Sequence, residues 1–335
     1  MTSFRAGTVR VLLTLSGLAA LPAVAYPASF DCGAARSPIE HAICDDAELS
    51  ALDSQLADAY RNALKGQGDA ADQLKMAQRQ WLKSRVTDGK IDPNSLKEAY
   101  RARITELKGM PVFPSPDAPV EGPTFRLVKA AKQHDFVLRM LDACPAEQSN
   151  DDTTCEGPAQ LLVYGKRQSK LLQTINLPNV IATLPKGGGS PLVNSARLYD
   201  DQGVLNVGDF NFDGEEDFGI QTGNEGSYGG PSYNVYLFDP KSGRFVYNDP
   251  MTGLILQTLG FFEVDEKHKL LHTEAKSGCC YHESTAYRVD HDVPVAVERH
   301  IEDAVITGGD KMKVTDEKLI NGKWRSKVHY ESGVN

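Results

Sequence analysis

Two kinds of hydrophobic spacing, separated by a short stretch rich in proline, divide this chain. Five prolines fall within residues 111–123, and proline fixes its own backbone angle and disfavours helix at the residue before it. Before this stretch apolar residues recur at spacings of three and four, as in amphipathic helices; after it they alternate, as in strands. The length of 335 residues fits about two domains. We therefore expect a helical domain at 26–110, a semi-rigid linker at 111–123 and a β-domain at 124–335.

The first residues have the composition of an export signal. Two arginines precede an apolar run, and residues 23–25 read Ala-Val-Ala, a small-residue cleavage pattern. We expect a signal peptide at residues 1–25, with cleavage after Ala28 or an uncleaved anchor helix as alternatives, and a periplasmic mature protein. Cys32 lies too far from the cleavage site to carry a lipid anchor. The mature part has no apolar run of the ~18 residues that a membrane span needs, so we expect no span there.

The charge of the chain is negative and is concentrated after the prolines. The formal net charge is −9, and residues 111–335 alone carry −10, with 32 acidic and 22 basic residues. A general nucleic-acid binder needs a basic surface, so we expect no nucleic-acid partner. An acidic domain of this kind is attracted to cationic proteins.

The six cysteines all lie in the expected mature part. An even number of cysteines in an exported chain predicts disulfides. Local spacing favours the pairs Cys32–Cys44, Cys144–Cys155 and the adjacent Cys279–Cys280. The alternative pairs Cys279 and Cys280 with Cys144 and Cys155.

Capping patterns mark the expected helix starts before residue 110. Residues 37–40 read Ser-Pro-Ile-Glu, a capping box with proline at the first helical position. Residues 45–48 repeat this pattern for a second helix, and Asp92 with Pro93 begins a fourth. The apolar faces are Leu49, Leu52, Leu56, Tyr60 and Leu64 in the second helix, Leu74, Ala77, Trp81 and Leu82 in the third, and Leu96, Tyr100, Ile104 and Leu107 in the fourth. These patterns predict a small helical bundle or hairpin.

After residue 124 short alternating runs are separated by turns rich in Gly, Asn and Asp. The runs are 136–141, 160–164, 170–175, 233–238, 261–264, 270–274, 285–289 and 326–330. No helical pattern lies between them. We therefore expect an α+β multidomain protein, in which the helical domain precedes an antiparallel β-sandwich or a propeller-like β-domain.

The most specific chemical motif is an acidic loop. Residues 209–217 read D-x-N-x-D-G-x-x-D, and strand-like residues flank them on both sides. Asp209, Asn211, Asp213 and Asp217, with the Glu215 carbonyl, offer the oxygen ligands that Ca²⁺ prefers, and the glycine allows the sharp turn. Ile220 stands where an EF-hand has its bidentate glutamate. We expect a structural Ca²⁺ site of the strand–loop–strand kind; a turn without an ion is the alternative.

Two further loops have the composition of recognition loops. Residues 277–283 read Ser-Gly-Cys-Cys-Tyr-His-Glu, and residues 224–233 combine glycines with Tyr228 and Tyr233. The first loop has poor spacing for a zinc site or for a cysteine nucleophile with His282 as its base. The chain carries no G-x-S-x-G, H-E-x-x-H or dinucleotide motif. We therefore expect no enzymatic activity, although a glycosidase carboxylate pair is not identifiable from sequence alone.

Residues 30–107 resemble the N-terminal domain of the LprI-type lysozyme inhibitor family. The residues that carry the resemblance are Phe30-Asp31-Cys32, Ser37-Pro38-Ile39-Glu40, Ile43-Cys44, Leu49, Leu52-Asp53, Tyr60, Gln80-Trp81-Leu82, Arg85, Tyr100, Arg103-Ile104 and Leu107. The family usually has another cysteine pair after the Trp-Leu element, and this chain has none there. The resemblance implies a helical domain that binds lysozyme.

Residues 200–300 are similar in kind to PliI-type lysozyme inhibitors and to immunity proteins against secreted cell-wall hydrolases. The matching segments are 208–217, 226–230, 233–239, 245–248 and 278–282. In such inhibitors a Ser-Gly-x-Tyr-like loop enters the glycosidase cleft. The resemblance therefore implies that Ser277, Tyr281 and His282 contact the target. We expect Tyr228 of the glycine-rich loop to be a further contact residue.

These observations favour an exported inhibitor or immunity protein that blocks a lysozyme-like peptidoglycan hydrolase. The first alternative is a calcium-stabilised structural or adhesive module of the cell envelope, which would not act on lysozymes. The second is a hydrolase that uses acidic residues. The resemblance, and not the composition, supplies the inhibitory function.

Overall fold

The computed structural model describes residues 28–67, 71–85, 91–145, 153–166, 170–186, 188–196, 202–306, 308 and 311–332. The expected signal peptide lies outside the described residues. The described chain divides into two compact units, one comprising residues up to 59 together with 85–104, the other comprising 60–84 together with 105–335. Among the described residues, no helix is both long and apolar enough to span a membrane.

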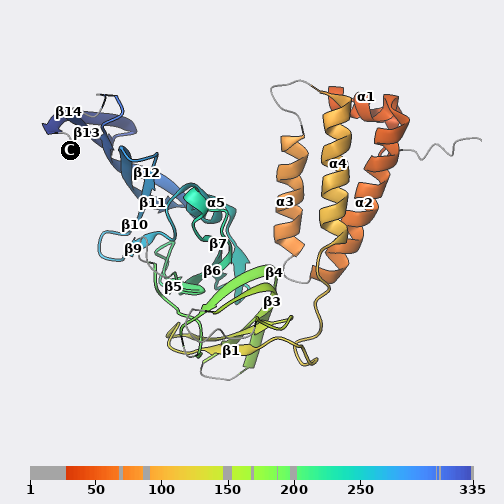
Figure 1. Ribbon diagram of the computed structural model, residues 1–335, viewed down its shortest axis with the longest axis horizontal. Coiled ribbons are helices and arrows are strands. Elements are labelled where there is room, and N and C mark those ends of the chain that lie inside the picture. The colour runs from red at the N-terminus through yellow and green to blue at the C-terminus, as the bar shows by residue number, and fades with distance from the viewer. Residues whose placement is uncertain are drawn as a thin grey trace, which may run out of the picture. The chain divides into compact units, whose positions relative to one another are not determined.

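The helices that follow Ser37 and Asp92 begin where the capping patterns predict, and the helix that follows Asp46 begins one residue later than the pattern at 45–48 indicates (Figure 1). The helices are α1 (Pro38–Asp45), α2 (Ala47–Gln67), α3 (Ala71–Ser84) and α4 (Pro93–Lys108), preceded by the short 3₁₀ helix η1 (Cys32–Ala34). Ser37 and Glu40 form the expected capping box. Asp46 accepts the Leu49 N–H at 3.0 Å, and Asp92 accepts the Ser95 N–H at 2.9 Å. Each cap satisfies a backbone donor that the first helical turn leaves free.

The strands form three antiparallel sheets in the described part of the chain, and none closes into a barrel. The first sheet contains β1 (Thr124–Leu127), β2 (His134–Met140), β3 (Thr153–Gly165) and β4 (Lys170–Leu184). The second contains β5 (Leu205–Gly208), β6 (Asp217–Gly223), β7 (Ser232–Asp239) and β8 (Arg244–Tyr247). The third contains β9 (Glu263–Asp265), β10 (Leu270–Lys276), β11 (Tyr281–Asp290), β12 (Val293–Asp303), β13 (Lys311–Ile320) and β14 (Lys323–Ser332). The α+β class is confirmed.

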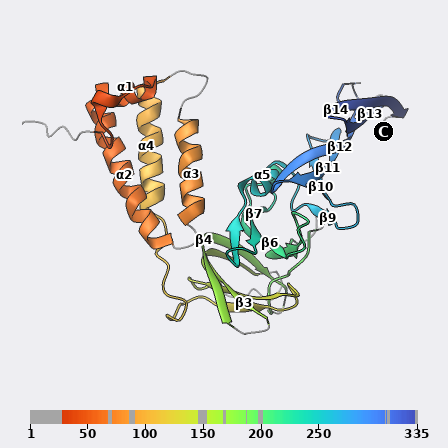
Figure 2. The same ribbon diagram turned by 180° about the vertical axis from the view of Figure 1, so that it is seen from behind.

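The first two sheets pack face to face around one hydrophobic core (Figure 2). Phe136 of β2 contacts Phe218 of β6, with ring centroids 5.3 Å apart, and Phe218 lies 4.9 Å from Phe245 of β8. Leu161 and Ile175 of the first sheet are fully buried in the same core. Face-to-face packing of consecutive four-stranded sheets occurs in sandwiches and between neighbouring propeller blades, so both β-architectures named from the sequence fit this arrangement.

The second sheet is covered on its other face as well. Tyr233 and Val235 of β7 pack against α5 (Asp249–Gln257) and against Phe261 and Phe262 in a second core. The helix α5 was not expected from the alternating pattern. Because both faces of the second sheet are buried, β6 has buried residues at nearly every position and not at every other position.

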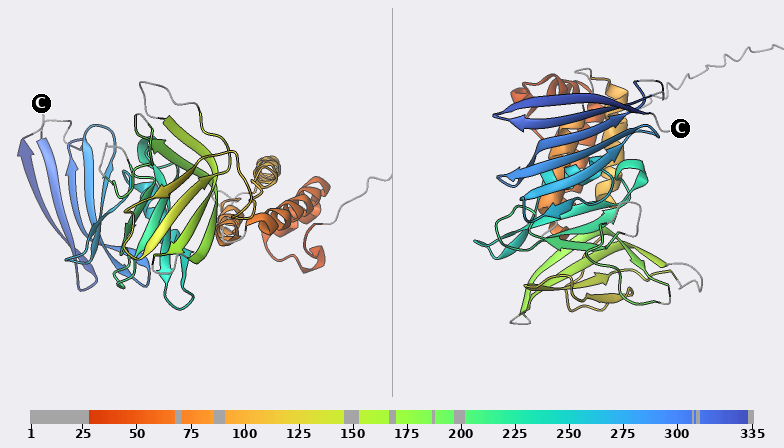
Figure 3. Two further views of the ribbon diagram at one scale, coloured as in Figure 1. Left: turned by 90° about the horizontal axis from the view of Figure 1, so that it is seen from below. Right: turned by 90° about the vertical axis from the view of Figure 1, so that its left-hand side faces the viewer.

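The third sheet is a meander of six consecutive strands, drawn in blue shades in Figure 3. Its first strands, β9 and β10, lie against the second core through Val264 and Leu271. Its last described strand, β14, has nine of its ten residues exposed. From β9 to β14, the strands of this sheet therefore change from buried in a core to exposed to solvent.

All three expected disulfides are confirmed. The bonds are Cys32–Cys44, Cys144–Cys155 and Cys279–Cys280. The alternative cross-pairing of the last four cysteines is excluded.

Candidate functional site

The loop between β10 and β11 meets the short 3₁₀ helix η3 (Ser227–Gly229). The Gly278 N–H donates a hydrogen bond to the Tyr228 hydroxyl, and the Lys276 ammonium group lies 4.9 Å from the centre of the Tyr228 ring. The structure therefore brings together two loops that are 50 residues apart in sequence. We call residues 227–229 and 277–282 the tyrosine–cystine loops.

The adjacent cysteines of these loops are fixed to the third sheet. The Ser277 N–H donates to the Tyr281 carbonyl at 3.0 Å, which closes the turn around the disulfide. The Cys280 carbonyl accepts the Ala304 N–H at 2.8 Å. The Cys280 side chain packs against a small cluster that contains Met312 and Val314. The loop thus has a defined shape, and Cys279 is exposed at its tip.

The predicted contact residues differ in how far they reach solvent. Tyr228 is 63% exposed, whereas the Tyr281 hydroxyl donates to Glu283 at 2.6 Å and its ring is half-buried. Burial and the Glu283 carboxylate raise the pKa of Tyr281 to about 12. His282 is exposed, with Nδ1 4.0 Å from a Glu302 oxygen. Of the two tyrosines, Tyr228 presents the larger free surface.

Sequence reasoning missed Lys276 and Glu283, which hold the two tyrosines in place. Lys276 lies over the Tyr228 ring, and Glu283 accepts both the Tyr281 hydroxyl and the Thr285 hydroxyl. The signal was available for Glu283, because residues two apart on a strand share a face. No spacing rule links Lys276 to Tyr228, since they lie on separate elements.

The expected calcium loop is a tight turn between β5 and β6. The Asp213 N–H donates to Asp209 Oδ1 at 3.0 Å and to Asn211 Oδ1 at 3.2 Å, and the Gly214 N–H donates to Asp209 Oδ2 at 2.9 Å. Gly214 has a φ of 94°, which other residues rarely adopt. The side-chain oxygens of Asp209 and Asn211 therefore accept backbone N–H groups of one turn.

Asp217, the last residue of the motif, is the first residue of β6. It is fully buried, and its two oxygens accept the N–H groups of Phe210 and Phe238 at 2.8 and 2.9 Å. Burial raises the pKa of Asp217 to about 7. Within the described residues, no group of three or more His, Cys, Asp and Glu side chains is arranged to hold a metal. The structure thus gathers the side chains of the first half of the motif and uses Asp217 to connect the loop to β7.

A buried polar network lies inside the helical part. Asp53 of α2 accepts the Ser29 N–H at 2.8 Å and the Tyr100 hydroxyl at 3.0 Å. The Tyr100 oxygen in turn accepts a hydrogen bond from Arg85 at 2.5 Å. Tyr100 is fully buried, and burial raises the pKa of its hydroxyl. On the surface, Lys97 of α4 pairs with Asp46 at 2.6 Å.

Asp53, Arg85 and Tyr100 of this network lie in a segment that matches a known protein family. Residues 32–109 match the family model "Lysozyme inhibitor LprI". "Lipoprotein LprI" of Mycobacterium tuberculosis (strain ATCC 25618 / H37Rv) and its counterpart in Mycobacterium bovis are each 32% identical over 108 residues. That match covers 30% of this chain and 54% of each relative, so the chain spans about half the length of the curated relatives it matches. The resemblance to LprI inferred from the sequence is confirmed for this segment.

A solved structure also matches. It is described as "Structure of a Xanthomonas Type IV Secretion System related protein", with 24% identity, a TM-score of 0.45, and coverage of 61% of this chain and 97% of that one.

The residues that carry the LprI resemblance mostly stabilise the segment itself. Asp53 and Tyr100 belong to the buried network, and Cys32 and Cys44 form the disulfide of the LprI segment. Leu82 is an exception, because its apolar side chain is 41% exposed on α3. Among the large apolar residues of this set, Leu82 is the one with an exposed side chain.

Proposed function

We propose that this protein is an exported, non-enzymatic inhibitor that binds and blocks a lysozyme-like, peptidoglycan-degrading glycosidase in the periplasm. The observation that carries the proposal is the match of residues 32–109 to the lysozyme inhibitor family. The curated relatives are described as lipoproteins. In this chain the first cysteine after the expected cleavage site, Cys32, is bonded to Cys44, so a lipid-free periplasmic form is the one we propose.

The tyrosine–cystine loops are the proposed contact surface of the β-containing unit. Tyr228 offers an exposed aromatic ring, and its side chain is held by the Gly278 N–H at the hydroxyl and by the Lys276 ammonium group over the ring. Ser277, Tyr281 and His282 flank it. Exposed aromatic side chains on pre-formed loops contribute strongly to protein–protein affinity, because little conformational entropy is lost on binding.

The decisive experiment measures the lytic activity of a panel of lysozymes and bacterial muramidases with and without the purified full chain. We expect stoichiometric inhibition of at least one enzyme. Tyr228→Ala should raise the inhibition constant by about tenfold or more if this loop is a main contact. Tyr330→Ala is the matched control, because Tyr330 is 59% exposed on β14.

A third variant separates the two candidate surfaces. Leu82→Glu should weaken inhibition if the LprI segment binds the target, and it should have no effect if the loops alone bind. If the full chain leaves the lytic rate of every enzyme in the panel unaltered, the proposal is contradicted. Calcium-dependent binding to envelope extracts would then favour the structural or adhesive module.

We also propose that the loop 209–217 binds one structural Ca²⁺. The support is the D-x-N-x-D-G-x-x-D spacing and the convergence of Asp209 and Asn211 on the turn. Asp209, Asn211, Asp213 and the Glu215 carbonyl would hold the ion, with Asp217 fixing the loop to β7. Ca²⁺ would neutralise the clustered carboxylates and stabilise the turn.

Calorimetry and thermal unfolding with Ca²⁺ or EDTA test this site. We expect Ca²⁺ to raise the melting temperature, and Asp213→Asn to abolish the shift. Asp239→Asn is the matched control, because Asp239 also accepts backbone N–H groups in an exposed turn. An equal melting temperature in Ca²⁺ and EDTA would show that the loop is a turn without an ion.

A further inference from the structure

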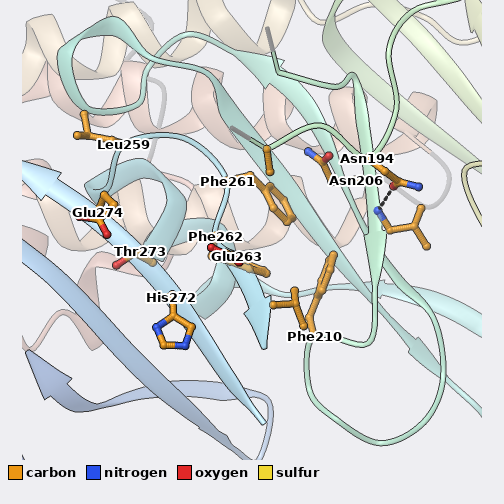
Figure 4. A pocket seen from close by; sticks show the side chains of 13 residues that line it. Asn194, Asn206, Phe210, Leu259, Phe261, Phe262, Glu263, His272, Thr273 and Glu274 are labelled. Carbon is orange, nitrogen blue, oxygen red and sulfur yellow. Dashed lines mark hydrogen bonds between the residues drawn. The ribbon is translucent and has the colours of Figure 1, made fainter. Parts of the chain in front are cut away.

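The two edge strands of the third sheet differ in length and in exposure. The inner edge strand, β9, has three residues and lies beside a pocket of about 520 Å³ between the second and third sheets (Figure 4). The residues that line this pocket include Phe210, Phe261, Glu263 and His272. The outer edge strand, β14, lies at the far end of the sheet and has ten residues, of which nine are exposed (Figure 3). The inner edge is therefore packed against the rest of the fold, whereas the outer edge faces solvent.

The strand β14 also differs from the edge strands of the other two sheets. In the described chain, β1, β5 and β8 have four residues each, and all but two of the 15 residues of β4 are buried or half-buried. Short or covered edge strands protect proteins from pairing with other chains. By contrast, β14 is long and exposed, contains no proline and pairs with β13 without a bulge. Every second residue of an edge strand directs its N–H and C=O away from the sheet, so β14 offers these groups to another strand.

The two faces of β14 differ in their chemistry. Side chains alternate between the faces of a strand, so Trp324, Val328 and Tyr330 share one face, where they are 37, 48 and 59% exposed. The other face carries the ionisable residues Lys323, Arg325, Lys327, His329 and Glu331. A charged side chain on the apolar face protects many natural edge strands from pairing. In β14 no charged residue lies on that face.

The sequence of β14 is complementary to its own reverse. When two copies of the strand run antiparallel and are centred on Val328, Arg325 of one copy lies opposite Glu331 of the other. This charge pair occurs twice by symmetry. Val328 lies opposite itself on the two-fold axis, and Ser326 lies opposite Tyr330. Opposite charges and apolar residues in facing positions stabilise a strand pair, so β14 fits a second copy of itself.

This register is more favourable than the neighbouring ones. It pairs residues 324–332 of both copies and places Lys327 opposite His329. Centring the pair on Lys327 would bring two ammonium groups opposite each other, which destabilises a strand pair. Centring it on His329 would shorten the paired segment to 326–332. Within each strand, one Glu331 oxygen lies 3.1 Å from His329 Nε2, which leaves the second oxygen for Arg325 of the other copy.

We propose that this protein forms a symmetric dimer in which β14 pairs antiparallel with β14 of a second copy, centred on Val328. The third sheets of the two copies become one continuous sheet, and the outward N–H and C=O groups of both edges are satisfied. A foreign strand would satisfy the same backbone groups. The placement of Arg325 and Glu331 at equal distances from Val328 favours a second copy, because only self-pairing uses both ends of the strand in this way. The dimer does not depend on the proposed inhibitory function.

Sedimentation equilibrium of the purified protein tests the dimer. We expect a mass twice that of one chain at about 100 µM. Val328→Lys should raise the dissociation constant of the dimer by at least about tenfold, because it brings two ammonium groups together on the axis. Val246→Lys on β8 is the matched control and should leave the dimer intact, because Val246 is 49% exposed and Val328 is 48% exposed. A single-chain mass at about 100 µM, or an unchanged dissociation constant in Val328→Lys, would contradict the proposal.

An exchange of charges tests the pairing without altering the apolar face. Arg325→Glu and Glu331→Arg should each raise the dissociation constant by at least about tenfold, because each places like charges opposite each other twice. An equal mixture of the two variants should form a heterodimer as stable as the unaltered dimer, since each introduced charge then faces an opposite one. Both positions are exposed, so circular dichroism should show an unchanged fold. A mixture that stays monomeric would overturn the proposal, and so would a dimer that both single variants leave intact.

Discussion

Asp53 shows how a single buried carboxylate organises the helical part. It accepts hydrogen bonds from Ser29 and Tyr100, and Tyr100 in turn accepts from Arg85. The apolar spacing of α4 predicts a buried Tyr100. No spacing rule separates Asp53 from Asp45 or Asp58, which are exposed. Whether an acidic side chain on a helix is buried depends on its partners from other elements, and these partners are not encoded in the local pattern.

Asp53→Ala should therefore destabilise the protein. The substitution removes the acceptor of the buried Tyr100 hydroxyl and of the Ser29 N–H, and unsatisfied buried donors cost roughly 1–3 kcal/mol. Denaturant unfolding followed by circular dichroism measures the loss. Asp45→Ala, at an exposed position of α1, is the control. Equal stability of the two variants would show that the network contributes nothing.

The pair His300 and Asp316 should make the stability of the folded protein depend on pH. The hydrogen bond from His300 Nδ1 to Asp316, at 2.8 Å across β12 and β13, raises the pKa of His300 above its ordinary 6.5. The folded state then holds the proton more tightly than the unfolded state. The stabilisation is complete below pH 6.5 and is lost as the pH rises through the pKa of the folded state. NMR titration of His300 should give a lower pKa in Asp316→Asn, while Asp290→Asn, the control, should leave it unchanged.

At the scale of elements, the helix starts and the disulfides followed the sequence signals closely, whereas α5 did not. Asn248 caps α5 by accepting the Met251 N–H at 2.8 Å, and a proline follows in its first turn. This cap is visible in the sequence. Apolar spacing does not reveal this helix, because nine residues between alternating runs make too few turns to show a helical period.

Gly219→Ala should destabilise the second sheet. The new methyl group would lie 2.2 Å from Phe261 Cε2 and 2.7 Å from Cζ. Because Phe261 is buried, the ring cannot move away freely, and overpacking of this kind costs about 1–3 kcal/mol. Thermal and denaturant unfolding measure the effect. Gly253→Ala in α5, where a Cβ meets nothing within 4 Å, is the control and should be neutral or stabilising.

For the whole molecule, the sequence predicts the class of each region but not how the sheets stack. The three sheets are each built from consecutive strands, so local alternation and turns are sufficient to indicate them. The double burial of the second sheet arises from contacts between residues such as Tyr233 and Phe261, far apart in sequence. For the same reason the pocket between the second and third sheets could not be predicted, since its walls come from four separate segments.

The charge of the whole chain, −9, leads to a prediction about binding rates. If the proposed target is a cationic lysozyme, long-range attraction accelerates their encounter, and salt screens that attraction. Raising the salt from about 50 mM to about 500 mM should slow association by roughly tenfold with a smaller effect on dissociation. Stopped-flow fluorescence measures both rates. Association that is independent of salt would show that charge has no part in target selection.

The disulfides also differ in what they do to the unfolded chain. The cysteines of the first two bonds, Cys32–Cys44 and Cys144–Cys155, are separated by 12 and 11 positions in the sequence, whereas Cys279–Cys280 joins immediate neighbours. A cross-link that encloses no loop removes almost no conformational freedom from the unfolded state. The third bond therefore contributes to the local shape of one surface loop and hardly at all to chain entropy. Reduction of this bond would change the conformation of the loop beside Tyr228, and hence the surface that a partner contacts. It would not unfold the protein.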